Sequence, residues 1–302
     1  MFKDKANNFN AAARLPGDAV QAGEWQESNR SWWEKNSMRY DWDEKVPYPE
    51  FSKEFYQEID NRFFARVYDF FPWKEIPFDA LIDFKSLADK DVLEIGVGNG
   101  SVAQLLAQHA GFFTGIDLTE YAIKSTKKRL ELVGIGAHIE KMDAERLGFS
   151  DNSFDFVWSW GVIHHSSNTN KILGEIQRVL RPGGKAVVMI YHRGWWNYYV
   201  IGTIFRGILK GGFLKYGSLH NVMQANTDGA IARYYTTKEW RSALEKNFVI
   251  EDMFVCGSKT DLLPLPAGKI KNFLMRLLPN PLNRFLTRRL KYGSFLVSVF
   301  RK

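Results

Sequence analysis

The chain has 302 residues, of which 45% are apolar, 25% charged and 15% aromatic. This apolar share is enough for a packed core and excludes a chain that is disordered throughout. No run of about 18 apolar residues occurs, so no membrane span is expected, and the N-terminus lacks the apolar stretch of a secretory signal. The single cysteine, Cys256, excludes an internal disulfide and a thiol relay, and no metal site is expected. We therefore expect a cytoplasmic enzyme.

Positive charge gathers towards the C-terminus. From Leu262 onward there are nine Lys or Arg and no Asp or Glu, which exceeds the net charge of the whole chain, +7. A second stretch without acids, residues 176–227, carries seven Lys or Arg. Such asymmetry indicates an anionic partner for these segments, although a solvated basic face accounts for it equally well.

The first 80 residues differ in composition from the rest. Residues 1–23 are polar and predict a loose arm. Residues 24–80 are rich in aromatic and acidic side chains and are broken by prolines, which predicts short helices, the longest at about 49–71. Four tryptophans lie between positions 25 and 42. We expect residues 1–80 to form an arm and a helical lid over a domain of residues 81–302.

From residue 91 onward, apolar runs that predict buried strands alternate with stretches that predict helices. The alternation predicts an α/β fold, with a parallel sheet covered by helices on both faces. Ser101 is expected near the N-cap of the first of these helices. The expected strands are 91–95, 111–117, 137–141, 154–159, 185–191, 248–255 and 294–300, and the expected helices are 101–110, 119–132 and 168–180.

A glycine loop, Glu94–Gly100, follows the first expected strand. Glycines let a ligand approach the backbone, and the next helix directs its free N–H groups towards that ligand. The loop also fits the dinucleotide fingerprint when it is read from Gly98 to Ala103. Asp117, at the end of the second expected strand, suits the hydroxyls of a ribose. Because NAD and S-adenosylmethionine both carry a ribose, the loop alone leaves both cofactors open.

Two downstream stretches favour one of these cofactors by resemblance. Residues 141–165, KMDAERLGFSDNSFDFVWSWGVIHH, and residues 178–185, RVLRPGGK, resemble class I S-adenosylmethionine-dependent methyltransferases, in particular the ubiquinone/menaquinone methyltransferase-like group. With the glycine loop and Asp117, four ordered motifs match over about residues 90–192. The resemblance implies S-adenosylmethionine as the cofactor. It also implies a Rossmann-like sheet of seven strands, the last one antiparallel, with the helical lid and inserted helical cap segments added to it.

The same resemblance implies roles for residues at matching positions. Glu94 would hold the ammonium group of the cofactor, Asp117 its ribose hydroxyls and Asp143 the amine of its adenine. Trp160 and Gly161 would lie beside the sulfonium. The implied cofactor-binding set is Glu94, Gly96, Val97, Gly98, Gly100, Asp117, Leu118, Asp143, Ala144, Trp160 and Gly161.

Methyl transfer is a displacement at carbon, so alignment and exclusion of water do much of the work, and a base is needed only for some acceptors. Histidine suits that role, but each histidine near the site has a structural alternative as a capping or packing residue. The candidate bases are His164, His165 and His192, and the candidate acceptor contacts are Trp33, Tyr40, Tyr191 and Arg193.

Insertions at about 193–245 and 257–292 are long enough to build an acceptor site. We expect methyl transfer to an O, N, C or S atom of a small-molecule acceptor. The alternative is a lipid or quinone at the membrane surface, with residues 262–302 in contact with an anionic membrane. In the plainer alternative Phe273, Leu277 and Phe285 pack onto the domain and roof the acceptor pocket. A nucleic-acid methyltransferase and a non-catalytic binding protein are less well supported.

Overall fold

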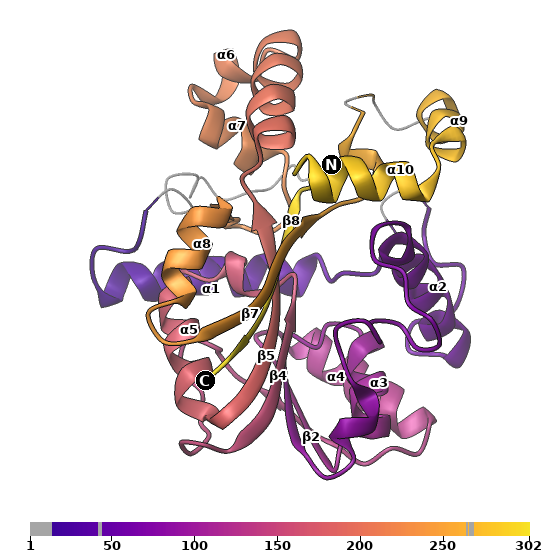
Figure 1. The fold of residues 1–302 in the computed structure, drawn as a ribbon, viewed down its shortest axis with the longest axis vertical. Helices are drawn as coiled ribbons and strands as arrows, with labels where there is room; N and C mark the ends of the chain where they lie inside the picture. Colours follow the sequence, from indigo (N-terminus) through magenta and orange to yellow (C-terminus); the bar gives the residue numbers. More distant parts are fainter. Residues whose placement is uncertain (1–13, 42–43, 264, 266–268) are drawn as a thin grey trace.

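The computed structural model describes residues 14–41, 44–263, 265 and 269–302. At its centre lies a mixed sheet whose strands run in the order β3-β2-β1-β4-β5-β8-β7 (Figure 1). The β1–β5 strands are parallel to one another, and β8 is antiparallel to both β5 and β7. The predicted Rossmann-like sheet with an antiparallel last strand is therefore confirmed. Its bounds are β1 (Asp91–Ile95), β2 (Phe112–Asp117), β3 (His138–Lys141), β4 (Phe154–Trp160), β5 (Leu180–His192), β7 (Val249–Cys256) and β8 (Phe295–Arg301), and a two-residue strand, β6 (Tyr234–Tyr235), pairs with β5.

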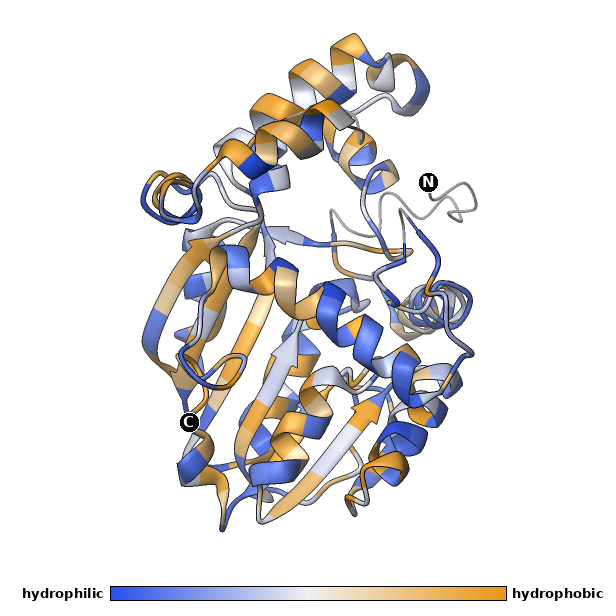
Figure 2. Cartoon of the chain, turned by 90° about the vertical axis from the view of Figure 1, so that its right-hand side faces the viewer, coloured by the Kyte–Doolittle hydropathy of each residue, from blue (hydrophilic) through white to orange (hydrophobic). Residues whose placement is uncertain are grey.

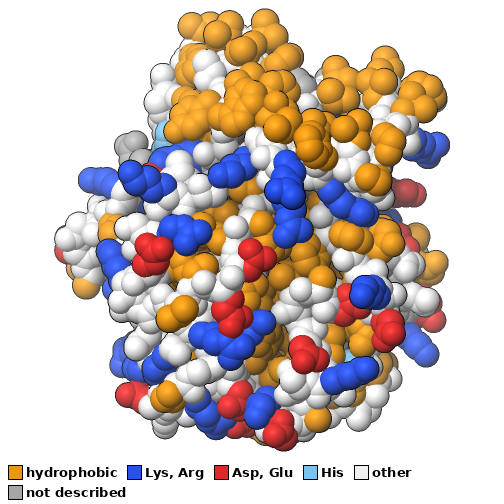
Figure 3. Space-filling model, viewed as in Figure 1, with side chains coloured by type: hydrophobic (Ala, Val, Ile, Leu, Met, Phe, Trp, Pro, Cys, Tyr) orange, Lys and Arg blue, Asp and Glu red, His pale blue; other side chains and the backbone are white. Residues whose placement is uncertain are grey.

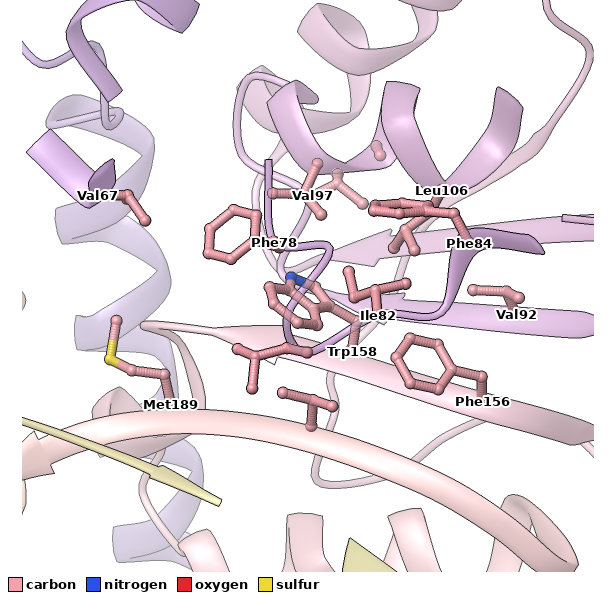
Figure 4. Close-up of a cluster of buried hydrophobic side chains, with 14 of the residues drawn as sticks. Val67, Phe78, Ile82, Phe84, Val92, Val97, Leu106, Phe156, Trp158 and Met189 are labelled. Carbon is pink, nitrogen blue, oxygen red and sulfur yellow. The ribbon is translucent and has the colours of Figure 1, made fainter. Parts of the chain in front are cut away.

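The strands are apolar because both faces of the sheet are covered. Successive residues of a strand point to opposite faces, and Val92 and Leu93 accordingly belong to two different core clusters. The first cluster holds Trp158 and Phe78, whose rings lie 5.0 Å apart (Figure 4). The helices on this face are α2 (Lys53–Phe70), α3 (Ser101–His109) and α4 (Glu120–Leu132), with the short helix η2 (Phe84–Leu87), and on the other face lie α5 (Thr169–Val179) and α8 (Thr237–Leu244).

The helices after β1 and β2 begin where the sequence predicts, but one cap differs. Thr119 caps α4 by accepting a hydrogen bond from the backbone N–H of Ala122. In α3 the N-cap is Gly100, with φ at +79°, and not a serine side chain. Ser101, expected near the N-cap, is the first residue of α3, and the cap before it is glycine because glycine favours the left-handed turn that ends the loop.

The N-terminal segment contains a helix that begins earlier than the composition predicts. Helix α1 (Ala19–Lys35) begins inside the stretch predicted to be a loose arm. Asp18 caps it by accepting a hydrogen bond from the N–H of Gln21 at 2.8 Å, and Trp25 and Trp32 are buried on one side of it. The expectation that all of residues 1–23 form a loose arm is therefore wrong from Asp18 onward, and residues 1–13 lie outside the described part of the chain.

Two groups of helices rise beyond the carboxyl ends of the parallel strands (Figures 1 and 2). The first lobe consists of the π-helix η4 (Trp195–Leu209), α6 (Gly212–Tyr216) and α7 (Leu219–Ala225). The second lobe consists of α9 (Lys269–Leu277), α10 (Asn280–Arg284) and the π-helix η6 (Phe285–Arg289). Among the described residues, no helix combines the length and the apolar character that crossing a membrane requires.

Glycines hold the first lobe together rather than break it. A Cβ on Gly207 would lie 2.3 Å from the ring of Phe213, and one on Gly202 would lie 2.9 Å from the sulfur of Met223. These two positions therefore let α6 and α7 pack directly on η4. Two further short helices follow strands of the sheet: η3 (Ile163–His165) comes after β4, and η5 (Lys259–Asp261) comes after β7.

Candidate functional site

A large cavity of about 1320 Å³ lies at the carboxyl ends of the parallel strands. Its walls come from the glycine loop, the ends of β2, β4 and β5, helix α1 and both lobes. Parallel α/β sheets bind their ligands at this edge. The volume exceeds the few hundred Å³ of an ordinary small-ligand pocket, so two ligands fit side by side.

The glycine loop leaves open space at one position. Gly96, Gly98 and Gly100 all have positive φ, at +85°, +55° and +79°. A Cβ on Gly96 would lie 2.3 Å from Val162, whereas a Cβ on Gly98 would meet no atom within 4 Å. Gly98 lines the cavity, so its backbone is bare towards a ligand. Gly100 does not line the cavity; it turns the chain into α3 and packs against Thr126 and Arg129.

Glu94 is the most unusual polar residue of the site. Its side chain lines the cavity and is 4% exposed, and within the described residues its Oε2 has no hydrogen-bond partner. Burial, and next the charge of Asp117, hold the pKa of this carboxyl well above its ordinary value. A buried carboxyl with an open oxygen fits a cationic group in the cavity.

Asp117 and Asp143 lie at the strand ends beside the loop. Asp117 accepts hydrogen bonds from the N–H of Gly98 at 3.2 Å and from the N–H of Thr119 at 3.0 Å. Asp143 accepts from the side-chain amide of Gln26 at 2.8 Å. Burial raises the pKa of both carboxyls. Both remain able to accept further bonds from a ligand, because each carboxylate has about four acceptor sites.

Helix α1 closes this end of the cavity. Glu34 accepts hydrogen bonds from the backbone N–H groups of Glu120 and Tyr121, at 2.9 and 3.0 Å, and so caps α4 from another part of the chain. The side chain of Asn99 donates to the carbonyl of Met38 at 2.6 Å. These bonds fasten α1 to α4 and the residues after α1 to the glycine loop.

The far end of the cavity is aromatic, with hydroxyl and carboxyl groups set into it. Tyr191, two residues beyond Met189 on β5, donates its hydroxyl proton to Asp228 at 2.5 Å. Tyr234 hydrogen-bonds Thr227 and stacks on Tyr191, with ring centroids 5.4 Å apart. Burial, and next Asp228, raise the pKa of Tyr191 well above its ordinary value. Its phenol is therefore neutral at physiological pH.

The three histidines predicted as candidate bases occupy different environments. His165 lines the cavity, and its Nδ1 donates to the carbonyl of Ile231 at 2.6 Å, which leaves the lone pair of the neutral ring on Nε2. His164 is fully buried behind Tyr191, with ring centroids 3.9 Å apart, and burial lowers its pKa well below the ordinary value. His192 does not line the cavity and bonds the carbonyl of Gly293 at 2.9 Å.

The structure brings most of the predicted site residues to one cavity. Those that line it are Trp33, Tyr40, Glu94, Gly96, Val97, Gly98, Asp117, Leu118, Asp143, Ala144, Trp160, Gly161, His165 and Tyr191. Trp160 also stacks on Trp158, with ring centroids 5.3 Å apart. Those that do not line it are Gly100, His164, His192 and Arg193. The Arg193 side chain instead pairs with Glu239 on α8.

Several residues of the site were missed from the sequence. Gln26 and Asn29 come from α1, whose start is marked by Asp18 with Gln21 three residues later, a capping pattern that predicts a helix. Asp228 follows a stretch of polar residues without periodicity. Its partnership with Tyr191 is made across 37 positions, and no local sequence signal indicates it.

Comparison with known proteins agrees with this site. Residues 93–188 match the family model of the methyltransferase domain. The phthiotriol/phenolphthiotriol dimycocerosates methyltransferase of Mycobacterium tuberculosis is 41% identical over 100 residues, which is 32% of this chain and 36% of that protein. The C-methyltransferase UbiE of ubiquinone/menaquinone biosynthesis from Cupriavidus metallidurans is 32% identical over 107 residues, 34% of this chain and 44% of that protein.

Solved structures agree in fold over a longer stretch. A Bacillus halodurans protein provisionally classed as a methyltransferase covers 74% of this chain and 98% of its own, with a TM-score of 0.50 and 18% identity. The MccD protein covers 74% of this chain and 95% of its own, with a TM-score of 0.50 and 15% identity. Identity at this level supports the fold alone.

The match to the methyltransferase domain therefore covers residues 93–188, about a third of the chain. At the level of this domain, the predicted enzyme class, a methyltransferase, agrees with the matched family model and with the names of the relatives. The chain spans about a third of the length of the first curated relatives it matches. The lid, both lobes and most of the acceptor end of the cavity lie outside the matched residues.

Proposed function

We propose that the protein transfers the methyl group of S-adenosylmethionine to a small-molecule acceptor bound at the aromatic end of the cavity. The observation that carries this proposal is Glu94, a buried carboxyl with an open oxygen beside the bare backbone of Gly98. NAD is anionic at its phosphates, and a buried carboxyl at that position disfavours it. The amino-acid end of S-adenosylmethionine carries an ammonium group that such a carboxyl attracts.

The residues of the cofactor end fit the parts of this cofactor in order. Glu94 would hold the ammonium, Asp117 the ribose hydroxyls and Asp143 the amine of the adenine. Gly96, Val97, Leu118 and Ala144 would supply backbone and apolar contacts. When bound, S-adenosylmethionine supplies a methyl group that its sulfonium already activates.

The protein's part in the reaction is alignment and removal of a proton. Trp160 and Gly161 lie at the end of β4, and the N–H of Gly161 donates to the carbonyl of Met189 at 3.2 Å, so the ends of β4 and β5 are held in register where the two ligands meet. The bonds that fasten α1 keep water out. In the transfer the carbon–sulfur bond breaks, sulfur keeps the electron pair, and the methyl carbon bonds to the acceptor.

A hydroxyl or an ammonium acceptor must also lose a proton. Tyr191 faces the cavity and donates to Asp228. Its oxygen can accept the acceptor's proton while its own proton passes to the Asp228 carboxylate, so no phenolate has to persist. His165 is the second candidate, through Nε2. His164 and His192 lie outside the cavity wall and support it rather than touch the acceptor.

The relatives act on different acceptors, so we expect the added segments of this chain to determine which class of acceptor it binds. Their names refer to phthiotriol dimycocerosates, phosphoethanolamine and ubiquinone or menaquinone. One specific observation favours the lipid or quinone alternative. Phe273, Leu277 and Phe285, expected in the plainer alternative to roof the pocket, are 61%, 62% and 53% exposed. We include contact of residues 262–302 with an anionic membrane in the proposal for this reason.

The experiment that tests this function has two stages. Calorimetry first measures binding of S-adenosylmethionine and of NAD to the full chain. Incubation with methyl-labelled cofactor and cell extract then shows whether label enters the aqueous metabolites, the organic-soluble lipids or neither. Binding of S-adenosylmethionine with label in either fraction supports the function. Absence of binding, or a preference for NAD, overturns it.

A further inference from the structure

The first lobe carries a solvent-facing apolar surface. Ile208, Leu209 and Leu214, at the end of η4 and in α6, are 62%, 69% and 96% exposed. Trp195, Tyr199 and Ile204 on η4 are also exposed. Scattered single apolar residues are ordinary on protein surfaces, but a group gathered on one projecting element indicates contact with an apolar phase.

The second lobe repeats this arrangement beside the first. Its exposed apolar residues are Ile270, Phe273, Leu277, Leu282, Phe285 and Leu290. In the described part of the chain, 12 of the 21 exposed large apolar residues lie on these two lobes or at their ends, so the distribution is not uniform. Figure 3 shows hydrophobic side chains over the upper parts of both lobes, with Lys and Arg side chains below them.

The sequences of the two lobes contain no acidic residue. The segments 195–225 and 269–291 together contain ten Lys or Arg and no Asp or Glu. Burial lowers the pKa of Lys271. The charge of Asp261 raises this pKa, and the charges of Arg206 and Lys210 lower it. Cations of the first lobe therefore lie near a cation of the second, and this arrangement favours an anionic counterpart.

The cavity opens between the two lobes. Arg206 of η4 and Met275 and Arg276 of α9 line it, together with Thr260 of η5. Thr260 and Arg276 are exposed, so the cavity reaches solvent here. The base of the first lobe is joined to the second by Trp196, whose ring stacks on Tyr292 with centroids 5.3 Å apart. The mouth of the cavity therefore lies between the exposed apolar side chains of the two lobes, and Arg206 and Arg276 lie at its edge.

We propose that the two lobes dock together on an anionic lipid bilayer and that the mouth between them admits a membrane-resident lipid acceptor from it. The apolar side chains would enter the boundary of the acyl chains, and the Lys and Arg side chains would meet the anionic headgroups. Each cation close to such a surface strengthens binding by about fivefold. The inference rests on the proposed function for the acceptor, whereas docking itself depends only on the two lobes.

A nucleic acid fits this surface less well. Nucleic acids are bound mainly through contacts of cations with phosphate, but here strongly exposed apolar residues, such as Leu214 and Ile270, share the surface with the cations. A lipid bilayer offers both an apolar phase and negative charge to one face of a protein. The observations therefore favour the membrane over an RNA.

The first experiment measures docking. Full-length protein is sedimented with vesicles of phosphatidylcholine alone and with vesicles containing roughly one-third phosphatidylglycerol. We expect binding to the anionic vesicles, and we expect the double variant Ile208→Glu and Leu214→Glu to lose at least tenfold of it. The matched control is Phe112→Glu and Val249→Glu, which changes two exposed apolar residues away from the lobes and should bind as wild type does. Equal sedimentation of both double variants, or no sedimentation of wild type at low salt, overturns the proposal.

The second experiment separates docking from the reaction. Labelled methyl transfer is followed with lipid extract presented in the anionic vesicles and, in parallel, dispersed in detergent micelles. We expect the lobe variant to lose activity on vesicles and keep it in micelles. Vesicle binding with no methyl transfer in either form supports docking and contradicts the proposed function. Methyl transfer confined to water-soluble acceptors, with the lobe variant as active as wild type, overturns lipid entry through the mouth.

Discussion

The two ends of the cavity are built in different ways. The cofactor end is made of strand ends and short loops, and nearly all of it falls within residues 93–188, the part that matches the methyltransferase domain. The acceptor end is assembled from β5, the insertion at about 193–245, η5, α9 and the start of β8. One end holds buried carboxyls with backbone partners, and the other holds aromatic rings and a tyrosine–aspartate pair.

This difference indicates that the two ends of the cavity have separate roles in binding. A cofactor of fixed chemistry is met by backbone geometry, which strand ends position rigidly. An acceptor that varies among related enzymes is met by side chains on added helices, which change without disturbing the sheet. Changes at one end should therefore affect cofactor affinity, and changes at the other should affect turnover and the choice of acceptor.

The largest expected effect lies at the acceptor end. Replacing Tyr191 with Phe or Asp228 with Asn removes the path for the acceptor's proton. We expect turnover to fall about 10²- to 10⁴-fold if the acceptor must lose a proton, with affinity for S-adenosylmethionine nearly unchanged. His165→Gln tests the second candidate base, and Tyr199→Phe, on an exposed face of η4, is the control. Turnover within a few-fold of wild type in all these variants would mean that alignment alone suffices, as for a thioether or a neutral amine.

The next effect lies at the cofactor end. Asp117→Ala removes the expected partner of two ribose hydroxyls and frees the N–H of Gly98. A loss of roughly 2–4 kcal/mol, or about 30- to 900-fold in affinity, is expected for S-adenosylmethionine, because bonds to charged groups contribute about 1.5–3 kcal/mol each and do not add fully. Calorimetry measures it, with Glu140→Ala on β3 as an exposed acidic control. Unchanged affinity would mean that Asp117 does not bind the cofactor.

The sheet could be predicted from sequence because its central strands are buried on both faces, and because glycine follows β1 and β4 and aspartate ends β2. The strand predicted at 91–95 coincides with β1, and the helix predicted at 119–132 differs from α4 by one residue. The antiparallel β8 followed from the resemblance and not from periodicity. Only the start of helix α1 was missed, because the polar composition of residues 1–23 predicts a loose arm, whereas its residues from Glu24 onward lie in the stretch predicted to form short helices.

The acceptor end could not be predicted in the same way. Tyr191 was expected near the acceptor because it ends a strand, but Asp228 comes from a turn after α7 and meets it only in the folded chain. The 195–209 stretch contains Gly202 and Gly207, and it nevertheless forms one continuous π-helix because these glycines pack against Met223 and Phe213. Contacts of this kind depend on tertiary packing, which no local pattern encodes.

A smaller effect concerns the proton on Glu94. Burial raises its pKa, so the free protein holds this proton to higher pH, while the cofactor's ammonium favours the carboxylate. Binding should therefore release a proton, and affinity should rise with pH by up to about tenfold per unit, below the pH at which the cofactor's own amine deprotonates. Calorimetry in two buffers of different protonation enthalpy detects this release. Glu94→Gln should abolish both effects, and proton release that persists in this variant would assign it elsewhere.

The smallest expected effect concerns the free energy of unfolding, which should depend on pH with opposite signs at the two ends of the cavity. His164, behind Tyr191, has its pKa lowered by burial, whereas in the unfolded chain it titrates near about 6.5. Below that pH the unfolded state binds a proton that the folded state excludes. The free energy of unfolding should therefore fall as pH decreases, by at most about 1.4 kcal/mol per pH unit. Glu94 has the opposite effect on stability. Because its pKa is higher in the folded protein than in the unfolded chain, the free energy of unfolding should fall as the pH rises between these two pKa values.

Denaturant unfolding between about pH 5 and 7 measures both contributions. His164→Phe keeps a ring against Tyr191 and should remove the acid-side slope, whereas His138→Gln, on an exposed strand, should leave it. Saturating S-adenosylmethionine should relieve the contribution of Glu94 and leave that of His164, because the ammonium reaches only the cofactor end. A cofactor that flattened the acid-side slope would show that the two ends are coupled through the cavity wall, and the division of work between them would then be wrong.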